Sequence, residues 1–306
     1  MPEYINRYLR LTFKINSVAD PITIDQSWKV TFNVKKYAAV DLMGFNTAEI
    51  SVYNMTSELI DTLAVRGGSV KLEAGYQGFH SCIFTGIVNN ITTSKQTTEL
   101  ITTFYCQSDL SVHAQSVEEC VQNISVTDYL KHLCEKFGVS YVLPFTKSDV
   151  VRESFTGSFR DVISKVCYNY DISIALDNGT IIFRDKKAKT EDIPNYMVKV
   201  FTPTSGLIGN PTVIESGIRF KALLQPELKV NDYFRLEAPY ADYNLNELEK
   251  RPNAVLGSEL NTLAHVTTRN YKGVYMALSL IFSGDTRGND WCTNVEGARL
   301  GLKQYA

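Results

Sequence analysis

The histidines are the side chains of this chain best suited to bind a metal ion or to act as a general base. The four of them are His80, His113, His132 and His265. They are isolated from one another, and none forms H-E-x-x-H or another spacing typical of metal ligands. The G-x-S-x-G motif of a nucleophilic serine is also absent. These patterns predict no catalytic, metal-binding or cofactor-binding residue, and they favour a surface position for His132 on a helix.

The cysteines are the next group that could carry chemistry. The six of them are Cys82, Cys106, Cys120, Cys134, Cys167 and Cys292. No two are close in sequence, and C-x-x-C does not occur. Scattered cysteines in a chain of this size indicate reduced, mostly buried thiols in a protein made in a cytosol. A disulfide framework is the weaker alternative.

Acidic pairs could supply the acid and base of a glycosidase, but these pairs are neighbours in polar runs. They are Glu118 with Glu119, Glu191 with Asp192, and Glu247 with Glu249. Glycosidase chemistry needs two carboxylates across a cleft, so we expect these side chains to face water. The sequence GDTRGND contains Asp285 and Asp290 but lacks the spacing of a calcium loop. A turn held by aspartate side-chain hydrogen bonds is the favoured interpretation, with a cation loop as the alternative.

Glycines and lysines could bind phosphate groups, but neither set has the required arrangement. Gly206, Gly209 and Gly217 do not form a dinucleotide-binding G-x-G-x-x-G, and we expect them to serve turns with positive φ angles. A short basic cluster lies in the charged stretch 184–195, which has the composition of a solvated linker. Its members are Lys186, Lys187 and Lys189. The chain has 31 Lys and Arg against 33 Asp and Glu, and this net charge of −2 lacks the basic footprint of a nucleic-acid-binding protein.

Length and composition indicate a globular protein with two or three domains. The 306 residues are 44% hydrophobic and 21% charged, which is ordinary for such a protein. The N-terminal sequence MPEYINRYLRLTFKI alternates polar and apolar residues, and it predicts a strand rather than a signal peptide. No segment approaches the length of an apolar membrane span.

The first third of the chain has the pattern of a compact barrel or sandwich. The expected strands are residues 8–15, 28–35, 48–53, 70–76, 82–91 and 99–107. Turns are expected at Asp20-Pro21 and Asp25-Gln26. Ser57 is the expected N-cap of a short helix that ends before Gly67. Six strands and one helix are therefore predicted here.

A helix–strand unit follows and is repeated 33 residues later. The shift aligns Ser125 with Ser158, Asp128 with Asp161, Cys134 with Cys167, Ser140 with Ser173, and Leu143 with Leu176. The first helix is expected to begin after Ser125 or Thr127 and to end at Gly138. The aligned cysteines lie on the apolar helix face and are interpreted as core residues. Residues 177–179 (Asp-Asn-Gly) predict a hairpin turn.

Strand patterns return after the charged stretch. The expected strands are residues 196–201, 211–224 and 233–238, with two more within 263–284 joined at 270–273. Residues 240–259 are polar and irregular, and they are expected to form an exposed loop. The segment after residue 284 is rich in turn residues, so we expect it to be only partly extended.

Several short sequences resemble those of the baseplate hub proteins of tailed phages, the group that includes late-control protein D and the hubs of Mu-like contractile tails. In the N-terminal part they are NTAEISVYNM (46–55), LEAGY (72–76) and IFTGIV (83–88). In the C-terminal part they are GLIGNP (206–211), ALLQPEL (222–228) and SGDTRGNDWCT (283–293). Their order and spacing carry the resemblance, which also reaches the N-terminal half of type VI secretion spike proteins.

The resemblance implies a mainly β fold with an α+β insert, in which two tube-like β-barrel domains flank a region of two helix–strand units. We place the N-terminal barrel at residues 1–108, the α/β region at 109–188 and the C-terminal barrel at 189–306. It also implies a homotrimer that forms a pseudo-hexameric ring, adapts a hexameric tail tube to a trimeric central spike, and forms part of the DNA channel. The implied partners are the tail tube or tube-initiator protein, the central spike, surrounding baseplate wedge proteins, and DNA that passes without sequence-specific binding.

A virion structural protein of the tail baseplate, assembled in the host cytoplasm, is therefore expected. It is expected to be no enzyme and to need no cofactor. A neutral or acidic channel wall would let DNA pass, since phosphate binding needs clustered Lys and Arg. The sequence carries no attached lysozyme-like or peptidase domain and ends at Ala306. We therefore expect a separate spike and no cell-wall hydrolysis by this polypeptide.

Three alternatives stay open at this point. The chain could be the hub of a tailocin or another contractile injection system. It could be a receptor-binding or glycan-binding tail protein, for which the loop 240–259, with Tyr240 and Tyr243, is the candidate surface. It could also be a hydrolase whose site is assembled in space from distant residues.

Overall fold

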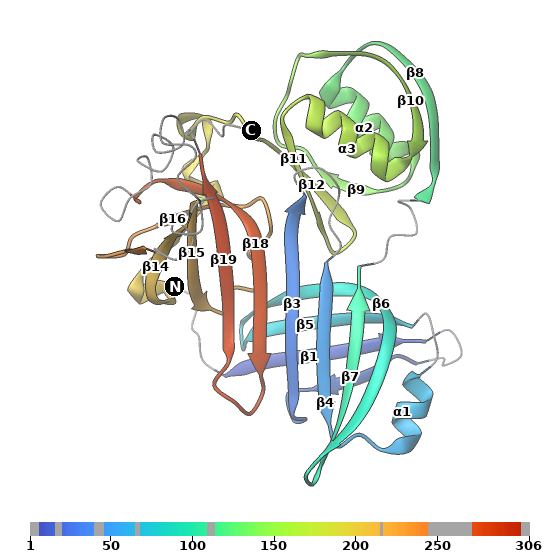
Figure 1. The fold of residues 1–306 in the computed structure, drawn as a ribbon, viewed down its shortest axis with the longest axis vertical. Helices are drawn as coiled ribbons and strands as arrows, with labels where there is room; N and C mark the ends of the chain where they lie inside the picture. The colour runs from blue at the N-terminus through green and yellow to red at the C-terminus, as the bar shows by residue number, and fades with distance from the viewer. Residues whose placement is uncertain are drawn as a thin grey trace, which may run out of the picture.

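A computed structural model shows a mainly β chain, as predicted from the sequence (Figure 1). The structure describes residues 6–15, 20–39, 46–64, 68–108, 114–214, 217–243 and 271–300. Strands β1 to β7 form an N-terminal part, β8 to β12 with two helices form a middle part, and β13 to β19 form a C-terminal part. None of the described helices is long and apolar enough to cross a membrane.

The N-terminal part is an antiparallel sheet with one short helix. Its elements are β1 (Arg7–Lys14), β2 (Ile22–Asp25), β3 (Val30–Ala39), β4 (Thr47–Tyr53), α1 (Ser57–Leu63), β5 (Ser69–Tyr76), β6 (Phe79–Gln96) and β7 (Glu99–Gln107). The strands follow the order β2-β1-β5-β6-β7-β4-β3. The sequence missed β2, because its four residues lie between two turn signals. The helix begins one residue earlier than predicted, since the Thr56 hydroxyl, not that of Ser57, accepts the amide of Leu59.

The middle part consists of two strand–helix–strand units that follow the predicted 33-residue repeat. The first unit is β8 (Ser116–Ser125), α2 (Val126–Lys136) and β9 (Ser140–Val142). The second is β10 (Val150–Ser158), α3 (Phe159–Asn169) and β11 (Ile172–Asp177), followed by β12 (Thr180–Asp185). Strands β8 and β10 pair antiparallel with each other, so the two units face each other about a local two-fold axis. The predicted hairpin turn joins β11 to β12, with positive φ at Asn178 and Gly179.

The same serine–aspartate pair caps both helices. The hydroxyl of Ser125 accepts the amide of Asp128 at 3.1 Å and donates to its carboxylate at 2.6 Å. Ser158 and Asp161 repeat this arrangement at 3.2 and 2.6 Å. Of the two predicted caps for α2, Ser125 is therefore the one used. The aligned cysteines Cys134 and Cys167 are buried in one core cluster, as predicted.

The C-terminal part contributes a second set of strands. Its strands are β13 (Val198–Phe201), β14 (Leu207–Ile214), β15 (Gly217–Leu223), β16 (Tyr233–Leu236), β17 (Asp242–Tyr243), β18 (Val274–Asp285) and β19 (Trp291–Arg299). They follow the order β13-β16-β18-β19-β15-β14-β17, and among the described strands of this part only β13 with β16 and β14 with β17 pair parallel. The predicted glycines 206, 209 and 217 all have positive φ. At residue 217 a Cβ would lie 2.1 Å from the carbonyl oxygen of Gly297, so a side chain has no space there.

The segment from residue 284 is partly extended, as predicted. Residues 286–289 bend between β18 and β19, and residues 291–299 form the central strand β19, with Trp291 and Val295 buried. Its core-facing residues alternate with polar ones, and a strand needs no continuous apolar run. One prediction for this part is wrong: the charged stretch 184–195 is not wholly solvated, since Arg184 lies in β12 and is buried. Most of the loop 240–259 and the strand expected before residue 270 lie outside the described residues.

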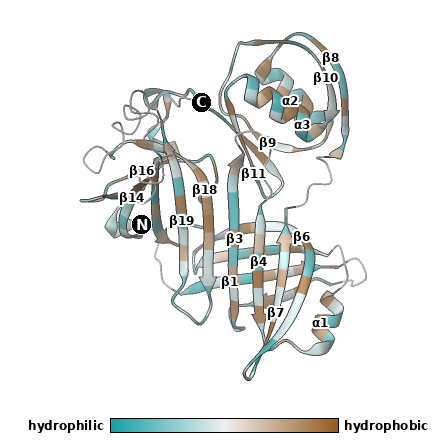
Figure 2. Cartoon of the chain, viewed as in Figure 1, coloured by the Kyte–Doolittle hydropathy of each residue, from teal (hydrophilic) through white to brown (hydrophobic). Residues whose placement is uncertain are grey.

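Alternation along the strands places the core on one side of each sheet. In β3 the residues Val30, Phe32 and Val34 are buried, whereas the alternate residues Thr31 and Asn33 are half-buried on the opposite face. Figure 2 shows hydrophobic and hydrophilic residues following one another along the strands. One hydrophobic cluster contains residues from both the N-terminal and C-terminal parts, and a second fills the middle part. The two outer parts are thus packed into one body. The boundaries at residues 108 and 188 remain our proposal, with β7 ending at Gln107 and β12 at Asp185.

Candidate functional site

A strand pairing joins the two ends of the chain into one sheet. Strand β3 pairs antiparallel with β18, from Tyr37 opposite Ser279 to Thr31 opposite Asp285. The result is a continuous series of strands in the order β14-β15-β19-β18-β3-β4-β7-β6. Figure 1 shows β19, β18, β3, β4 and β7 running side by side across the boundary. Backbone hydrogen bonds across this boundary fix the relative orientation of the two parts.

The turn GDTRGND (284–290) makes hydrogen bonds to residues of the N-terminal part, close to the β3–β18 pairing. The amide of Arg287 donates to the side chain of Asp285 at 2.8 Å, as predicted for an aspartate-stabilised turn. The Thr286 hydroxyl donates to the carbonyl of Trp28 and accepts the amide of Val30, at 2.8 and 2.9 Å. The guanidinium of Arg7 donates to two carbonyl oxygens of the turn, at 2.6 and 2.5 Å. The predicted turn is therefore a contact between the two β parts.

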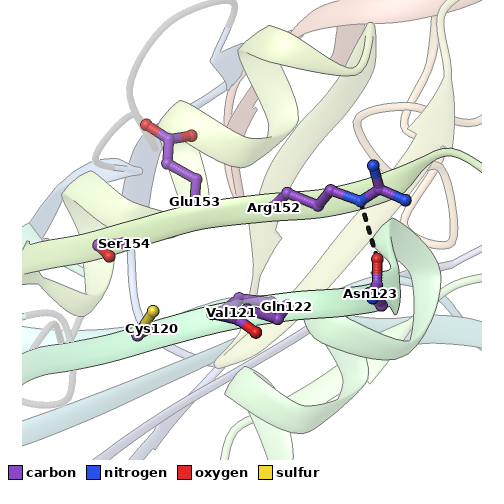
Figure 3. Close-up of a pocket in the computed structure, with 7 residues that line it drawn as sticks. All are labelled: Cys120, Val121, Gln122, Asn123, Arg152, Glu153 and Ser154. Carbon is purple, nitrogen blue, oxygen red and sulfur yellow. Dashed lines mark hydrogen bonds between the residues drawn. The ribbon is translucent and has the colours of Figure 1, made fainter.

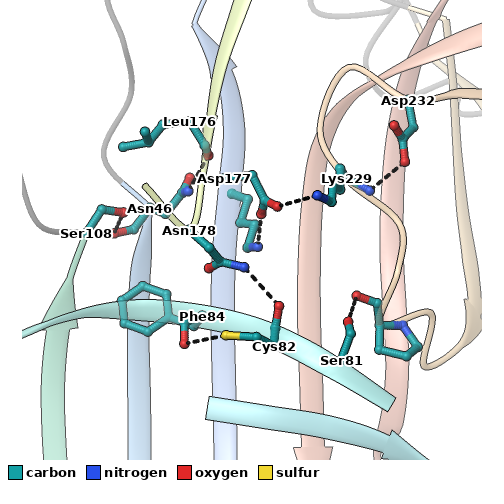
Figure 4. Close-up of polar contacts among 12 residues, drawn as sticks. Asn46, Ser81, Cys82, Phe84, Ser108, Leu176, Asp177, Asn178, Lys229 and Asp232 are labelled. Carbon is teal, nitrogen blue, oxygen red and sulfur yellow. Dashed lines mark hydrogen bonds and ion pairs between the residues drawn. The ribbon is translucent and has the colours of Figure 1, made fainter. Parts of the chain in front are cut away.

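Buried polar contacts attach the middle part at the same boundary (Figure 4). Asp177, at the end of β11, forms an ion pair with Lys36 of β3, and both residues are buried. Lys229 of the C-terminal part lies 3.4 Å from the other oxygen of Asp177. The amide group of Asn178 donates to the carbonyl of Cys82 at 2.9 Å. All three parts of the chain therefore meet around Asp177.

A second acidic residue lies on the same loop as Lys229. The carboxylate of Asp232 accepts the amide of Lys229 at 2.9 Å and lies 3.9 Å from both Arg184 and Lys199. Burial raises the pKa of Asp232, and burial lowers the pKa of Lys199. These groups connect β12, β13 and the loop before β16, and they have the arrangement of a structural charge network.

The two β parts repeat one strand arrangement. Strands β3-β4-β7-β6-β5 correspond in order, antiparallel pairing and chain sequence to β14-β15-β19-β18-β16. The correspondence extends to a β-bulge. In β6 the register shifts between Val88 and Asn90, and in β18 it shifts between Ala277 and Ser279. By strand order and bulge position, β6 is therefore equivalent to β18, and β3 is equivalent to β14.

The face of the shared sheet that points away from the core is polar and of mixed charge. The hydroxyls of Ser51 and Thr103 lie 2.8 Å apart on it, and Arg219 forms an ion pair with Glu296 at 2.5 Å. The other charged residues that alternation places on this face are Lys35, Glu49, Glu99, Lys221 and Asp285. Basic and acidic side chains are interspersed with Ser, Thr and Asn, and also with aromatic and aliphatic side chains, of which Tyr37 and Tyr105 are exposed. This is a continuous surface without clustered positive charge.

The residues considered for chemistry lie in unrelated places. His80 stacks on Tyr8 with ring centroids 3.8 Å apart, and His132 is half-exposed on α2, 3.3 Å from Glu119. Glu119 also pairs with Lys136 at 2.5 Å, while Glu118 is exposed. No group of three or more potential metal ligands occurs among the described residues. The positions outside the described residues are His113, His265, Glu247 and Glu249. The absence of site residues stays a prediction.

The thiols are mostly buried, as the sequence indicated. Cys106, Cys134, Cys167 and Cys292 are buried, and burial raises the pKa of Cys106 to about 12. Cys120 is exposed on β8 and lines a surface hollow of the β8–β10 ribbon (Figure 3). There Arg152 donates to Asn123 at 2.8 Å. The side chains lining this hollow form no nucleophile–base pair.

Comparison with known proteins connects this architecture to a family. The family model described as Baseplate hub gp41 matches residues 8–244. The chain belongs to this baseplate hub family. The sequence resemblance to phage baseplate hubs is therefore confirmed, and the family assigns this hub protein to the phage tail baseplate as a structural component. No curated protein sequence matches the chain.

Solved structures of tail proteins share the hub fold at low sequence identity. A tail protein from Neisseria meningitidis has a TM-score of 0.56 at 7% identity, covering 96% of this chain and 97% of that one. A 43 kDa tail protein of prophage MuSo2 from Shewanella oneidensis has a TM-score of 0.55 at 8% identity, covering 95% and 96%. The E. coli c3393 protein, a component of the type VI secretion system, has a TM-score of 0.52 at 12% identity, covering 94% and 77%. At these identities the likeness concerns the fold alone.

The sequence could not have identified the joint between β3 and β18, because the two strands lie far apart in the chain. One signal was available. Lys36 continues the core-facing series Val30, Phe32 and Val34 in β3. A lysine in core register predicts a buried acidic partner, and Asp177 is that partner.

Proposed function

We propose that three copies of this hub protein form a pseudo-hexameric ring that adapts a hexameric tail tube to a trimeric central spike. The observation that supports it is the repeated strand arrangement within one chain. Three chains with two equivalent β parts each present six equivalent units. Closed rings of this kind need head-to-tail interfaces, and the β3–β18 pairing is already such an interface between two units of one chain.

The outer face of the shared sheet is the proposed wall of a DNA channel. The remaining strands of each β part lie on the core side of this sheet. A ring of six β parts has more space for these strands outside the sheet than inside it, so the opposite, outer face would line the channel. Ser51, Thr103 and the paired Arg219 and Glu296 give this wall a polar, charge-balanced surface. Phosphate binding needs clustered Lys and Arg, so DNA would pass such a wall without being held.

The proposed partners are the tail tube or tube-initiator protein above the ring, the spike below it, and baseplate wedge proteins around it. Spike attachment accords with the E. coli c3393 protein, which is described as similar in structure to the T4 tail proteins gp27 and gp5. Assembly would take place in the host cytoplasm before the particle is complete. A hub of a tailocin or related injection system would use the same ring.

The test is the mass of the purified protein by light scattering, with negative-stain images of the same peak. A species of three chains with a central hole is the expected result. If the protein is a monomer, the measurement is repeated with candidate spike and tube proteins. A chain that stays monomeric with both would overturn the ring, and binding of a glycan array that is lost on Tyr240→Ala would then favour the receptor-binding alternative, since the Tyr240 side chain is 72% exposed.

A further inference from the structure

Strand β6 has a free edge along its second half. On one side β5 pairs with β6 only as far as Ile87, opposite Ser69. On the other side β7 pairs with β6 through to Gln96. Residues 90–96 therefore have no partner strand on the β5 side among the described strands. Unpaired edges of this kind are docking sites for another strand.

The equivalent stretch of β18 is occupied. Aligning the bulges of β6 and β18 makes residues 90–96 equivalent to 279–285. Residues 279–285 pair on one side with β19 and on the other side with β3. The edge that is free in the N-terminal part is therefore the edge that β3 fills in the C-terminal part.

The equivalent of β3 is β14, at the far end of the shared sheet. On the side where β3 pairs with β18, the pairing of β14 with described residues is limited to β17, at Thr212 and Val213. The free edge of β6 and the lightly covered edge of β14 therefore terminate the same eight-strand series. Strands β18 and β3, the equivalents of β6 and β14, pair with each other within the chain. The free edge of β6 and the edge of β14 are therefore expected to be complementary, and on a second copy they can pair.

We propose that β14 of one copy pairs antiparallel with residues 90–96 of β6 in the next copy, in the register of β3 with β18. This inference rests on the proposed ring function. Asn33 lies opposite Ser283 within the chain, and the equivalent residues are Thr212 and Ser94. Ser94 of one copy therefore lies opposite Thr212 of its neighbour. The same register places Thr93 opposite Val213.

The sequence of the free edge suits this pairing. Residues 91–94 are Ile-Thr-Thr-Ser, which favour strands, and Lys95 is the one charged residue of the free edge 90–96. Thr212 and Val213 on the other edge are also β-branched, and cross-strand pairs of such residues stabilise a sheet. Each copy uses one β6 edge and one β14 edge, so the contact is head-to-tail and three copies can close it.

Strand β17 covers part of the proposed interface in the single chain. Among the described residues it pairs with Thr212 and Val213, which the register of β3 with β18 places opposite Ser94 and Thr93 of the neighbour. Strand β6 of the next copy and β17 would therefore compete for the same edge of β14.

Engineered disulfides test the register. In a Cys120→Ser background, which removes the exposed native thiol, the variant S94C/T212C is oxidised and run without reductant. Opposed strand residues have the Cα separation that a disulfide needs. Within one chain the two cysteines are seven strand spacings apart, roughly 34 Å, so any bond is between copies. Covalent dimers and trimers in more than about half of the protein are expected.

Two matched variants serve as controls. N33C/S283C is the intrachain counterpart and should give a disulfide within a monomer. T23C/T212C joins β14 to the exposed strand β2 and should give no covalent species. If light scattering shows a trimer and N33C/S283C oxidises, but S94C/T212C stays uncrosslinked, the β6–β14 interface is wrong while the ring stands. If the protein forms no oligomer even with spike and tube proteins, the proposed ring is wrong.

Hydrogen exchange of the unmodified protein gives a second readout that needs no substitution. Amides in residues 90–96 that point to the free edge should exchange at least tenfold more slowly in the trimer than in the monomer. Amides of β2 should not change. Equal exchange of residues 90–96 in both states would overturn the proposal.

Discussion

Lys36 and Asp177 are 141 residues apart in sequence and form an ion pair whose side chains are only 3% and 5% exposed. Lys36 belongs to β3, the strand that joins the two β parts, and Asp177 ends the last strand of the second repeat unit. The pair therefore ties the middle part to the joint between the other two. Taking two charges out of water is costly, so the contribution of the pair depends on both members being present.

Replacing Lys36 alone should be strongly destabilising. Lys36→Met leaves Asp177 buried with only the more distant Lys229, and we expect the free energy of unfolding to fall by about 3 kcal/mol. The double variant K36M/D177L removes both charges and should be more stable than K36M. Denaturant unfolding followed by circular dichroism measures both. The matched control is Lys29→Met, whose partner Glu99 is at the surface, with an expected loss under about 1 kcal/mol.

Equal losses for Lys36→Met and Lys29→Met would show that the buried pair has no special role in stability. Greater instability of K36M/D177L than of K36M would show that Asp177 alone contributes favourably, which contradicts the cost assigned to an unpaired buried charge.

The two helix caps should contribute equally, because their geometry is repeated. Ser125→Ala and Ser158→Ala each remove a hydroxyl that accepts a helix N-terminal amide. Each should lower the free energy of unfolding by about 1 kcal/mol. Urea denaturation of the two single variants and the double variant checks this. Thr62→Ala is the control, since its hydroxyl only donates back to Glu58 within α1, and it should change stability little.

The α2 cap should also depend on pH. The Ser125 hydroxyl, aided by Lys131, lowers the pKa of Asp128 from its ordinary value of 3.8. A carboxyl with a lower pKa in the folded state stabilises the protein above its unfolded pKa, and this stabilisation is lost as pH falls through the folded pKa. The difference between wild type and Ser125→Ala should therefore be constant from pH 7 to pH 5 and shrink below pH 3.8. A difference that grows on acidification would contradict this sign.

Cysteine labelling should separate one thiol from the rest. Cys120 is exposed, whereas burial raises the pKa of Cys106 and of Cys134 to about 12. Iodoacetamide at pH 8 should modify Cys120 within minutes and leave Cys106 and Cys134 unmodified until the protein unfolds. Peptide mass spectrometry gives the extent at each site. Rapid modification of Cys134 in the native protein would contradict its place in the helix core.

The sequence predicted those caps, turns and strands that depend on a few neighbouring residues. Ser125 as one of two possible caps of α2, the hairpin at residues 177–179 and the alternating strand β1 all follow from a few neighbouring residues. Strands β8 and β10 were missed because their exposed faces are polar and only every fourth residue, such as Val117 and Val121, reaches the core. A pattern with so few apolar positions does not resemble a half-buried strand.

The β3–β18 pairing, on which the proposed ring depends, has no local signal in the sequence. Whether β3 pairs with β18 depends on residues far apart in the chain, and the repeat of the two β parts is one of strand order and register rather than of sequence. Family resemblance supplied the expectation of two tube-like parts. The pairing of Thr31 to Tyr37 with β18, and the shared polar face that results, required the arrangement in space.

If the proposed ring forms, charge on the outer face of the shared sheet should control its retention of DNA. Thr31, Thr47 and Asn294 are uncharged residues of this face. The variant T31K/T47K/N294K adds three positive charges per chain to the proposed channel wall. The wild-type protein should not retain a short labelled duplex at 150 mM salt, where proteins that bind DNA non-specifically have a Kd of about 10⁻⁴ to 10⁻⁶ M. The variant should bind it, with log affinity falling by about 0.9 per phosphate contact for each unit of log salt.

The control places the same charge elsewhere. T23K/Q26K/Q122K adds three lysines at exposed residues of the β1–β3 segment and of β8, outside the shared sheet, so its net charge equals that of the channel variant. The assignment is supported if only the channel variant gains affinity for the linear duplex. A closed circular duplex has no end that can enter the ring and should then not bind. Equal binding by both variants would mean that net charge alone is responsible, and the outer face of β3, β4 and β19 would lose its assignment as the channel wall.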